Sequence, residues 1–207
     1  MLKYPMSHKA LSLAIAGSFI AVVIVLSALS AHGRSYVPDT AGPGGKLLVM
    51  YAPEPHQALE LWRAQGVKGR VAVMFGRLGA NQSAVEPDDS TYLYHAIREG
   101  IVREVFHVIP DARWELVAGK LGSDEQFRAE GRGFRGTVNG TPLLITRFSD
   151  LPRLSEPVLA VLQGGTWSPE ELAPVEAAIR SSALASDMVV VTGDGHDEIM
   201  RGLGAGL

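Results

Sequence analysis

The residues best suited to chemistry in this chain of 207 residues lie close together near its C-terminal end. Carboxylates and imidazoles that follow a buried strand could hold a divalent cation, which would activate a water molecule. The alternative is a solvated loop that leads into a helix. We favour this alternative because no second group of ligands follows another predicted strand. The group comes directly after the apolar run 188–192 and consists of Asp194, His196, Asp197 and Glu198.

Other patterns that could carry chemistry are incomplete. The glycine-rich stretch 42–45 lacks the spacing of a phosphate-binding loop, and residues 76–79 lack the full dinucleotide-binding pattern. His56 precedes a predicted helix, His95 lies within one and His107 lies within a predicted strand, so we expect all three to be structural. The absence of cysteine excludes a disulfide scaffold and a thiol nucleophile. The net charge of −3 argues against a nucleic-acid binder.

The elements that must position these residues alternate along the chain between apolar strands and amphipathic helices. Helices are predicted at 56–65 and at 90–100, the second with Ser90 as its N-cap, and a hairpin is predicted at 136–146 around an Asn-Gly turn. This alternation predicts an α/β fold, in which a mainly parallel sheet carries helices on both faces. The strands of the sheet are expected at 46–51, 70–75, 104–109, 158–162 and 188–192.

A membrane anchor is predicted ahead of this domain. Residues 10–31 contain no charged side chain over 22 positions, and a helix of that length reaches ~33 Å, enough to cross a bilayer. A secretory signal peptide cleaved near residues 28–31 is the alternative. We therefore divide the chain into a cytoplasmic N-terminus (1–9), a transmembrane helix (10–31), a Gly- and Pro-containing linker (32–45) and an exported domain (46–207).

The orientation of the anchor follows from its flanking charges. Lys3 and Lys9 precede the span, whereas residues 47–207 carry a net charge of −6. We expect a bacterial-type inner membrane with the domain in the periplasm. One face of the predicted helix carries small residues that would allow another helix to approach closely. These are Ala10, Ala14, Gly17, Ser18 and Ala21.

The order of segments resembles the arginase/deacetylase-like α/β proteins. Three stretches carry this resemblance: HQALELWRAQGVKGRVAVMF (56–75), YLYHAIREGIVREVFHVIPD (92–111) and LPRLSEPVLAVL (151–162). The resemblance implies Asp/His metal motifs after the strands that here end at Phe75 and Leu162. The sequence reads GRLGA at the first place and QGGTW at the second, so neither offers carboxylates or imidazoles for a metal pair. We expect no catalytic residue, metal ligand or cofactor at either place.

These observations favour a non-catalytic protein. We expect a single-pass accessory or scaffolding subunit of a larger membrane complex. Energy-transducing complexes often contain subunits of this kind. Its partners would be other membrane-protein subunits and the lipid bilayer, with no nucleic acid. Arg77 and Trp167 are expected at the contact surface, since both residue types are enriched at interfaces. Two alternatives stay open: an anchored metal-dependent hydrolase that uses the group at 194–198, and a small-molecule binding domain that uses an emptied active-site cleft.

Overall fold

The computed structural model describes residues 35–36, 41–42, 45–80, 86–181 and 183–204. The predicted transmembrane helix at 10–31, its face of small residues and most of the linker lie outside the described residues. No helix within the described ranges combines the length and the apolar character that a membrane crossing requires.

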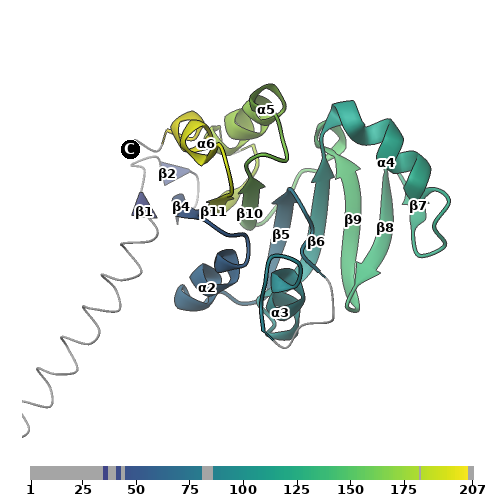
Figure 1. Ribbon diagram of the computed structural model, residues 1–207, viewed down its shortest axis with the longest axis horizontal. Helices are drawn as coiled ribbons and strands as arrows, with labels where there is room; N and C mark the ends of the chain where they lie inside the picture. The colour runs from purple at the N-terminus through teal and green to yellow at the C-terminus, as the bar shows by residue number, and fades with distance from the viewer. Residues whose placement is uncertain (1–34, 37–40, 43–44, 81–85, 182, 205–207) are drawn as a thin grey trace, which may run out of the picture. The chain divides into compact units, whose positions relative to one another are not determined.

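A nine-stranded sheet organises the domain, with the strand order β1-β4-β11-β10-β5-β6-β9-β8-β7 (Figure 1). The six strands from β4 to β9 in this order run parallel, and β1, β8 and β7 pair antiparallel at the two edges. A separate pair is formed by β2 (Ala41–Gly42) and β3 (Gly45–Lys46). The strands of the large sheet are β1 (Ser35–Tyr36), β4 (Leu48–Ala52), β5 (Arg70–Phe75), β6 (Val102–Ile109), β7 (Arg128–Glu130), β8 (Gly133–Val138), β9 (Thr141–Arg147), β10 (Val158–Gln163) and β11 (Ser186–Thr192).

Helices cover both faces of this sheet, and each face has its own apolar core. α2 (Gln57–Ala64) and α3 (Tyr92–Arg98) pack on one face, where Trp62 and Tyr92 are fully buried, and Trp114 of α4 (Trp114–Leu121) joins the same core. α5 (Pro169–Arg180) and α6 (His196–Gly202) pack on the other face. Figure 1 shows these two pairs of helices on opposite sides of the sheet. Short 3₁₀ turns occupy Asp111–Arg113 and Phe148–Asp150.

The predicted α/β architecture is confirmed. All five predicted strands occur, and the central ones are buried along almost their whole length because both faces are covered. The predicted hairpin is the antiparallel pair β8–β9. Its second arm also pairs parallel with β6, which makes β9 a sixth parallel strand that local sequence patterns did not indicate.

The predicted N-cap of α3 is wrong. Thr91, not Ser90, is the N-cap residue, and its side chain makes no capping hydrogen bond. The reason is the neighbouring Asp88, whose Oδ1 accepts hydrogen bonds from the Ser90 backbone N–H (2.8 Å), the Ser90 hydroxyl (2.8 Å) and the Thr91 hydroxyl (3.0 Å). A capping hydroxyl uses its oxygen as the acceptor, and Thr91 Oγ1 already accepts a hydrogen bond of 2.8 Å from the Asp88 backbone N–H.

Gly164 is needed where the chain leaves β10, and this generates a first prediction. A Cβ at this position would lie 1.8 Å from the Asp194 carbonyl oxygen, a backbone atom that has no room to move away. We expect Gly164→Ala to lower the free energy of unfolding by several kcal/mol, as overpacking at a rigid contact does. Urea unfolding followed by circular dichroism measures the loss.

The matched control for that substitution is Gly119→Ala in α4. A Cβ at Gly119 meets nothing within 4 Å, and alanine is favoured over glycine in a helix by about 1 kcal/mol. The control should therefore be neutral or stabilising. Equal stability of the two variants would contradict the close approach of the β10 and β11 ends.

Candidate functional site

Ligands of α/β sheets bind beyond the carboxyl ends of the strands, where neighbouring strands send their connections to opposite faces. The sheet has such a place between β5 and β10, because α3 follows β5 and α5 follows β10 onto the other face. A second one lies between β4 and β11, which are followed by α2 and α6. We call these the β5/β10 edge and the β4/β11 edge.

The Gln163 side chain joins the connections of the two strands at the β5/β10 edge. The Gln163 side chain crosses it, and its Oε1 accepts a hydrogen bond of 2.8 Å from the Arg77 backbone N–H. Gly76 packs so tightly on this side chain that a Cβ there would lie 2.5 Å from the Gln163 Cβ. From the neighbouring strand, His107 Nε2 donates to the Gly76 carbonyl oxygen at 2.8 Å. The first residues after β5 are therefore held from two sides.

Trp167 and Arg77, the two residues expected at a contact surface, differ in exposure. Trp167 is only 5% exposed, and its ring meets the Phe75 ring edge-on with centroids 5.7 Å apart. It is a core residue because the turn after β10 folds it back over the sheet. Arg77 is exposed and stands at a cavity of about 540 Å³. The lining of this cavity is Arg77, Leu78, Gly79, Ala80, Asp89, Ser90, Phe127, Thr137, Val138, Leu143 and Gln163.

At the β4/β11 edge, aromatic and acidic side chains meet. Tyr51 of β4 stacks on His196 at the start of α6, with ring centroids 3.8 Å apart and an interplanar angle of 20°. Partial burial raises the pKa of Tyr51, and the nearby carboxylates of Asp197, Asp194 and Glu54 raise the same pKa further. The edge thus carries a concentration of negative charge.

The predicted ligand group at 194–198 does not converge on one point. His196 Nε2 lies 3.2 Å from Asp197 Oδ1, but Asp194 and Glu198 also line a separate cavity of about 230 Å³ on the α5 side. Within the described ranges, the group of three metal-type ligand atoms that do converge belongs to Glu54, His56 and Asp89, all within 4.8 Å of one another. Glu54 and His56 of this group follow β4 directly, whereas Asp89 comes from the segment before α3.

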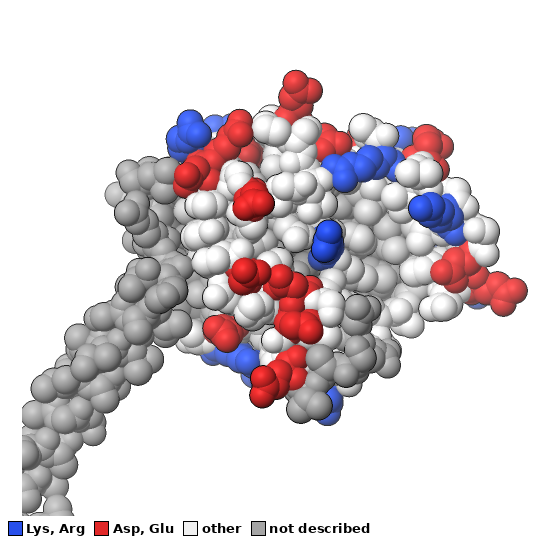
Figure 2. Space-filling view, viewed as in Figure 1, with Lys and Arg blue, Asp and Glu red and all other residues white. Residues whose placement is uncertain are grey.

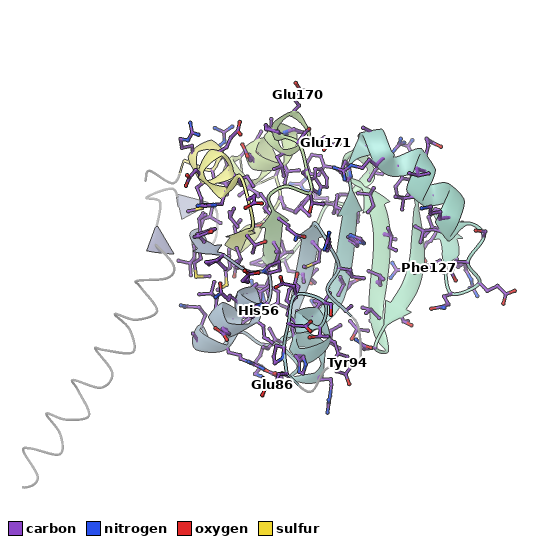
Figure 3. The ribbon with its side chains drawn as sticks, in the orientation of Figure 1. His56, Glu86, Tyr94, Phe127, Glu170 and Glu171 are labelled. Atoms are coloured by element: carbon purple, nitrogen blue, oxygen red, sulfur yellow. The ribbon has the colours of Figure 1, made fainter. Side chains whose placement is uncertain are left out.

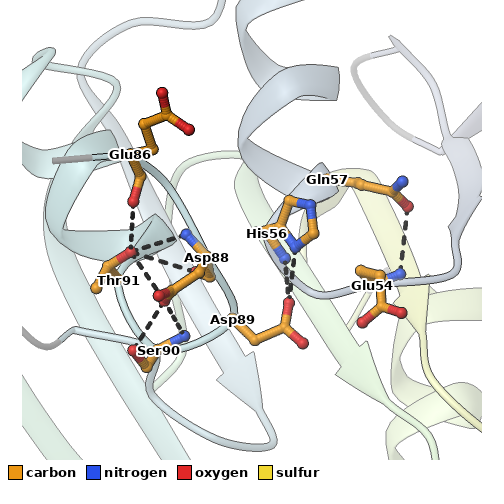
Figure 4. A network of polar contacts seen from close by, with 8 residues as sticks. All are labelled: Glu54, His56, Gln57, Glu86, Asp88, Asp89, Ser90 and Thr91. Atoms are coloured by element: carbon orange, nitrogen blue, oxygen red, sulfur yellow. Dashed lines mark hydrogen bonds and ion pairs between the residues drawn. The ribbon is translucent and has the colours of Figure 1, made fainter. Parts of the chain in front are cut away.

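His56 and Asp89 join the starts of two helices across this edge (Figure 4). Asp89 Oδ1 accepts a hydrogen bond of 3.0 Å from the His56 backbone N–H and lies 2.9 Å from His56 Nδ1. Beside them, the Glu54 backbone N–H donates to Gln57 Oε1 at 3.2 Å, so the Glu54 carboxylate takes no part in that bond. Figure 3 shows His56 at the start of α2, and Asp and Glu side chains gather around this place in Figure 2.

The sequence offered one signal for this group. Glu54 and His56 follow β4 directly, and Asp89 precedes α3, so both segments had to end at the same edge of a parallel sheet. His56 and Asp89 are 33 positions apart in the sequence, so local residue spacing could not predict that they meet.

A scan against protein-family models and searches of curated proteins and of solved structures found no match to this chain. The resemblance to the arginase/deacetylase-like proteins therefore rests on the three sequence stretches alone.

The burial of Trp167 generates a prediction for stability. Trp167→Ala should lower the free energy of unfolding by about 3–5 kcal/mol, because it leaves a cavity against Phe75. The matched control is Leu116→Ala, since Leu116 is 68% exposed and its loss should change stability by less than about 0.5 kcal/mol. Thermal and urea unfolding measure both. A Trp167→Ala variant as stable as the control would place this side chain on a surface.

His107 generates a prediction for pH. Burial lowers the pKa of His107, and its hydrogen bond to Gly76 offsets only part of that shift. The unfolded chain therefore takes up a proton near pH 6.5 that the folded chain does not. Stability should be complete above this pH and fall as the pH drops below it, by at most about 1.4 kcal/mol per pH unit from this residue.

The variant His107→Gln keeps a donor for Gly76 and removes the titration. Urea unfolding at pH 7 and pH 5 should show a smaller loss of stability for the variant than for the wild type. An NMR titration of the imidazole protons gives the folded pKa directly. A His107 pKa at or above 6.5 in the folded protein would contradict the prediction.

Proposed function

We propose that this chain is a single-pass membrane protein whose α/β domain serves as a non-catalytic accessory or scaffolding subunit of a larger membrane complex. The observation that carries the proposal is the chemistry of the β5/β10 edge. In a sheet of this topology a ligand is expected there, and here the Gln163 side chain crosses the edge and bonds to the backbone of Arg77. Among the described residues, the lining of the cavity beside Gln163 has one carboxylate, Asp89, and no imidazole, which is too few groups to hold a metal pair.

Two features support a role in an assembly. Residues 10–31 are free of charged side chains and long enough for a membrane anchor. Arg77 is exposed at a cavity of about 540 Å³ whose lining includes apolar side chains such as Phe127 and Leu143. An arginine beside apolar surface suits the contact of a neighbouring subunit that inserts an apolar side chain and offers a carboxylate to the guanidinium.

The hydrolase alternative at 194–198 has less support. A metal-dependent hydrolase needs at least three ligands that meet at one ion, and the three that meet among the described residues are Glu54, His56 and Asp89. The binding-domain alternative would use the cavity of about 540 Å³ beside Gln163, which we assign to a partner subunit because Arg77 stands exposed at it.

The proposal predicts what happens when the full chain is extracted from membranes. With a C-terminal affinity tag and a mild detergent, the chain should stay in the membrane fraction after a carbonate wash and should co-purify with a partner at fixed stoichiometry. Arg77→Glu should reduce the retained partner at least tenfold, because it reverses the charge at the contact.

The matched control is Arg128→Glu, which reverses an exposed charge on β7 at the far edge of the sheet. This variant should retain the partner as the wild type does. Release of the chain by the carbonate wash would refute the anchor. A wild-type chain that elutes alone and monomeric, by size exclusion with light scattering, would refute the accessory role.

A further inference from the structure

We propose that Glu54, His56 and Asp89 form a binding site for one divalent transition-metal cation, such as Zn²⁺ or Mn²⁺, at the β4/β11 edge. An accessory subunit needs no such ion, so this inference goes beyond the proposed function and does not depend on it. The ligand set, one imidazole and two carboxylates, suits borderline cations of this kind.

The distances suit a single ion. Two ligand atoms on one Zn²⁺ lie at most about 4.2 Å apart, since each bond measures about 2.1 Å. His56 Nδ1 and Asp89 Oδ1 are already 2.9 Å apart, close to the spacing of two ligands on one metal. All three ligand atoms lie within 4.8 Å of one another, and the exposed Glu54 side chain can close the small remaining gap. The cation would take the place of the proton between His56 and Asp89.

The backbone holds these ligands in position without the ion. Glu54 stands between Pro53 and Pro55 in the turn that opens α2, and the Pro53 carbonyl oxygen accepts a bond of 3.3 Å from the Gly193 N–H after β11. Asp89 belongs to a loop that the hydrogen bonds of Asp88 tighten. Rigid support of this kind lowers the cost of bringing charged ligands together.

An independent observation is a buried hydroxyl with nothing to bind. Thr192, the last residue of β11, is 0% exposed, and its Oγ1 has no hydrogen-bond partner among the described residues. Leaving a buried hydroxyl unpaired is unfavourable. Its strand neighbours are Ala52 and Gln163. An unsatisfied group of this kind indicates a further polar ligand at this point.

Strand alternation places this hydroxyl on the face of the sheet that also carries the proposed site. Val190 faces the core beneath α2 and α3, so Thr192, two residues later, faces the same side at the carboxyl end of the strand. His56 and Asp89 stand at the starts of α2 and α3, on that face and at that end.

The charge of the edge also favours a cation. The carboxylates of Asp194, Asp197 and Glu54 all raise the pKa of Tyr51, so all three lie near its hydroxyl group. Mutual repulsion of such carboxylates falls when a divalent ion binds among them.

The test uses the purified full-length chain in detergent, stripped with chelator and titrated with ZnCl₂ or MnCl₂ by isothermal calorimetry. We expect one ion per chain. We expect each of three substitutions to weaken the affinity at least tenfold, because losing even a group that supports a metal ligand has an effect of that size. The substitutions are His56→Ala, Asp89→Asn and Glu54→Gln. X-ray absorption of the zinc form should show nitrogen and oxygen donors.

The matched control is the pair His196→Ala and Asp197→Asn. These residues offer the same side-chain types at the same edge, with His196 Nε2 3.2 Å from Asp197 Oδ1, and both variants should bind the ion as the wild type does. Glu54→Gln keeps the test decisive if His56→Ala fails to fold, because Glu54 is exposed and makes no side-chain bond among the described residues.

Any of three results would overturn the inference. The first is a wild-type chain that binds no stoichiometric ion at about 100 micromolar metal, and the second is an unchanged affinity in both Glu54→Gln and Asp89→Asn. The third is a loss of binding in the control pair, which would assign the ion to the group at 194–198. Partner retention is a separate measurement, made with Arg77→Glu, so failure here is distinguishable from failure of the proposed function.

Discussion

The burial of six parallel strands on both faces is the constraint on which the rest of this structure depends. Strands such as β5, β10 and β11 expose almost nothing, so every connection must carry apolar side chains back over one face or the other. α2 and α3 do so on one face, α5 and α6 on the other. Because all six strands run the same way, their carboxyl ends and the loops that follow share one edge.

The two places where connections part at this edge have opposite chemical characters. At the β5/β10 edge, glycines allow close packing and Gln163 spans the gap with one hydrogen bond to the backbone of Arg77. At the β4/β11 edge, Tyr51 stacks on His196 near the carboxylates of Asp194, Asp197 and Glu54, and Glu54 also lies close to His56 and Asp89. The β5/β10 edge is crossed by Gln163 beside a cavity of about 540 Å³, whereas carboxylates gather at the β4/β11 edge. Asp89 lies between the two places, since it lines that cavity and also bonds to His56.

Some features of this edge cost stability, and the rest of the core offsets them. The Thr192 hydroxyl lies fully buried without a partner among the described residues, and His107 is held in a buried position that disfavours its charged form. The two apolar cores, with fully buried side chains such as Trp62 and Phe75, supply the compensating burial. Unpaired polar groups that persist against such a cost are expected where a protein meets a ligand or another chain.

The amino-acid sequence by itself determined the elements: the apolar runs became strands, Asn139-Gly140 became the hairpin turn, and strand–helix alternation predicted the two-faced sheet. These features depend on neighbours a few positions apart, which hydrophobic periodicity and turn chemistry record directly. Only the tertiary structure decided that β9 pairs parallel with β6, that Trp167 lies in the core, and that His56 meets Asp89. Those outcomes depend on which segments the sheet brings side by side, and no local pattern encodes a contact between residues that distant in the chain.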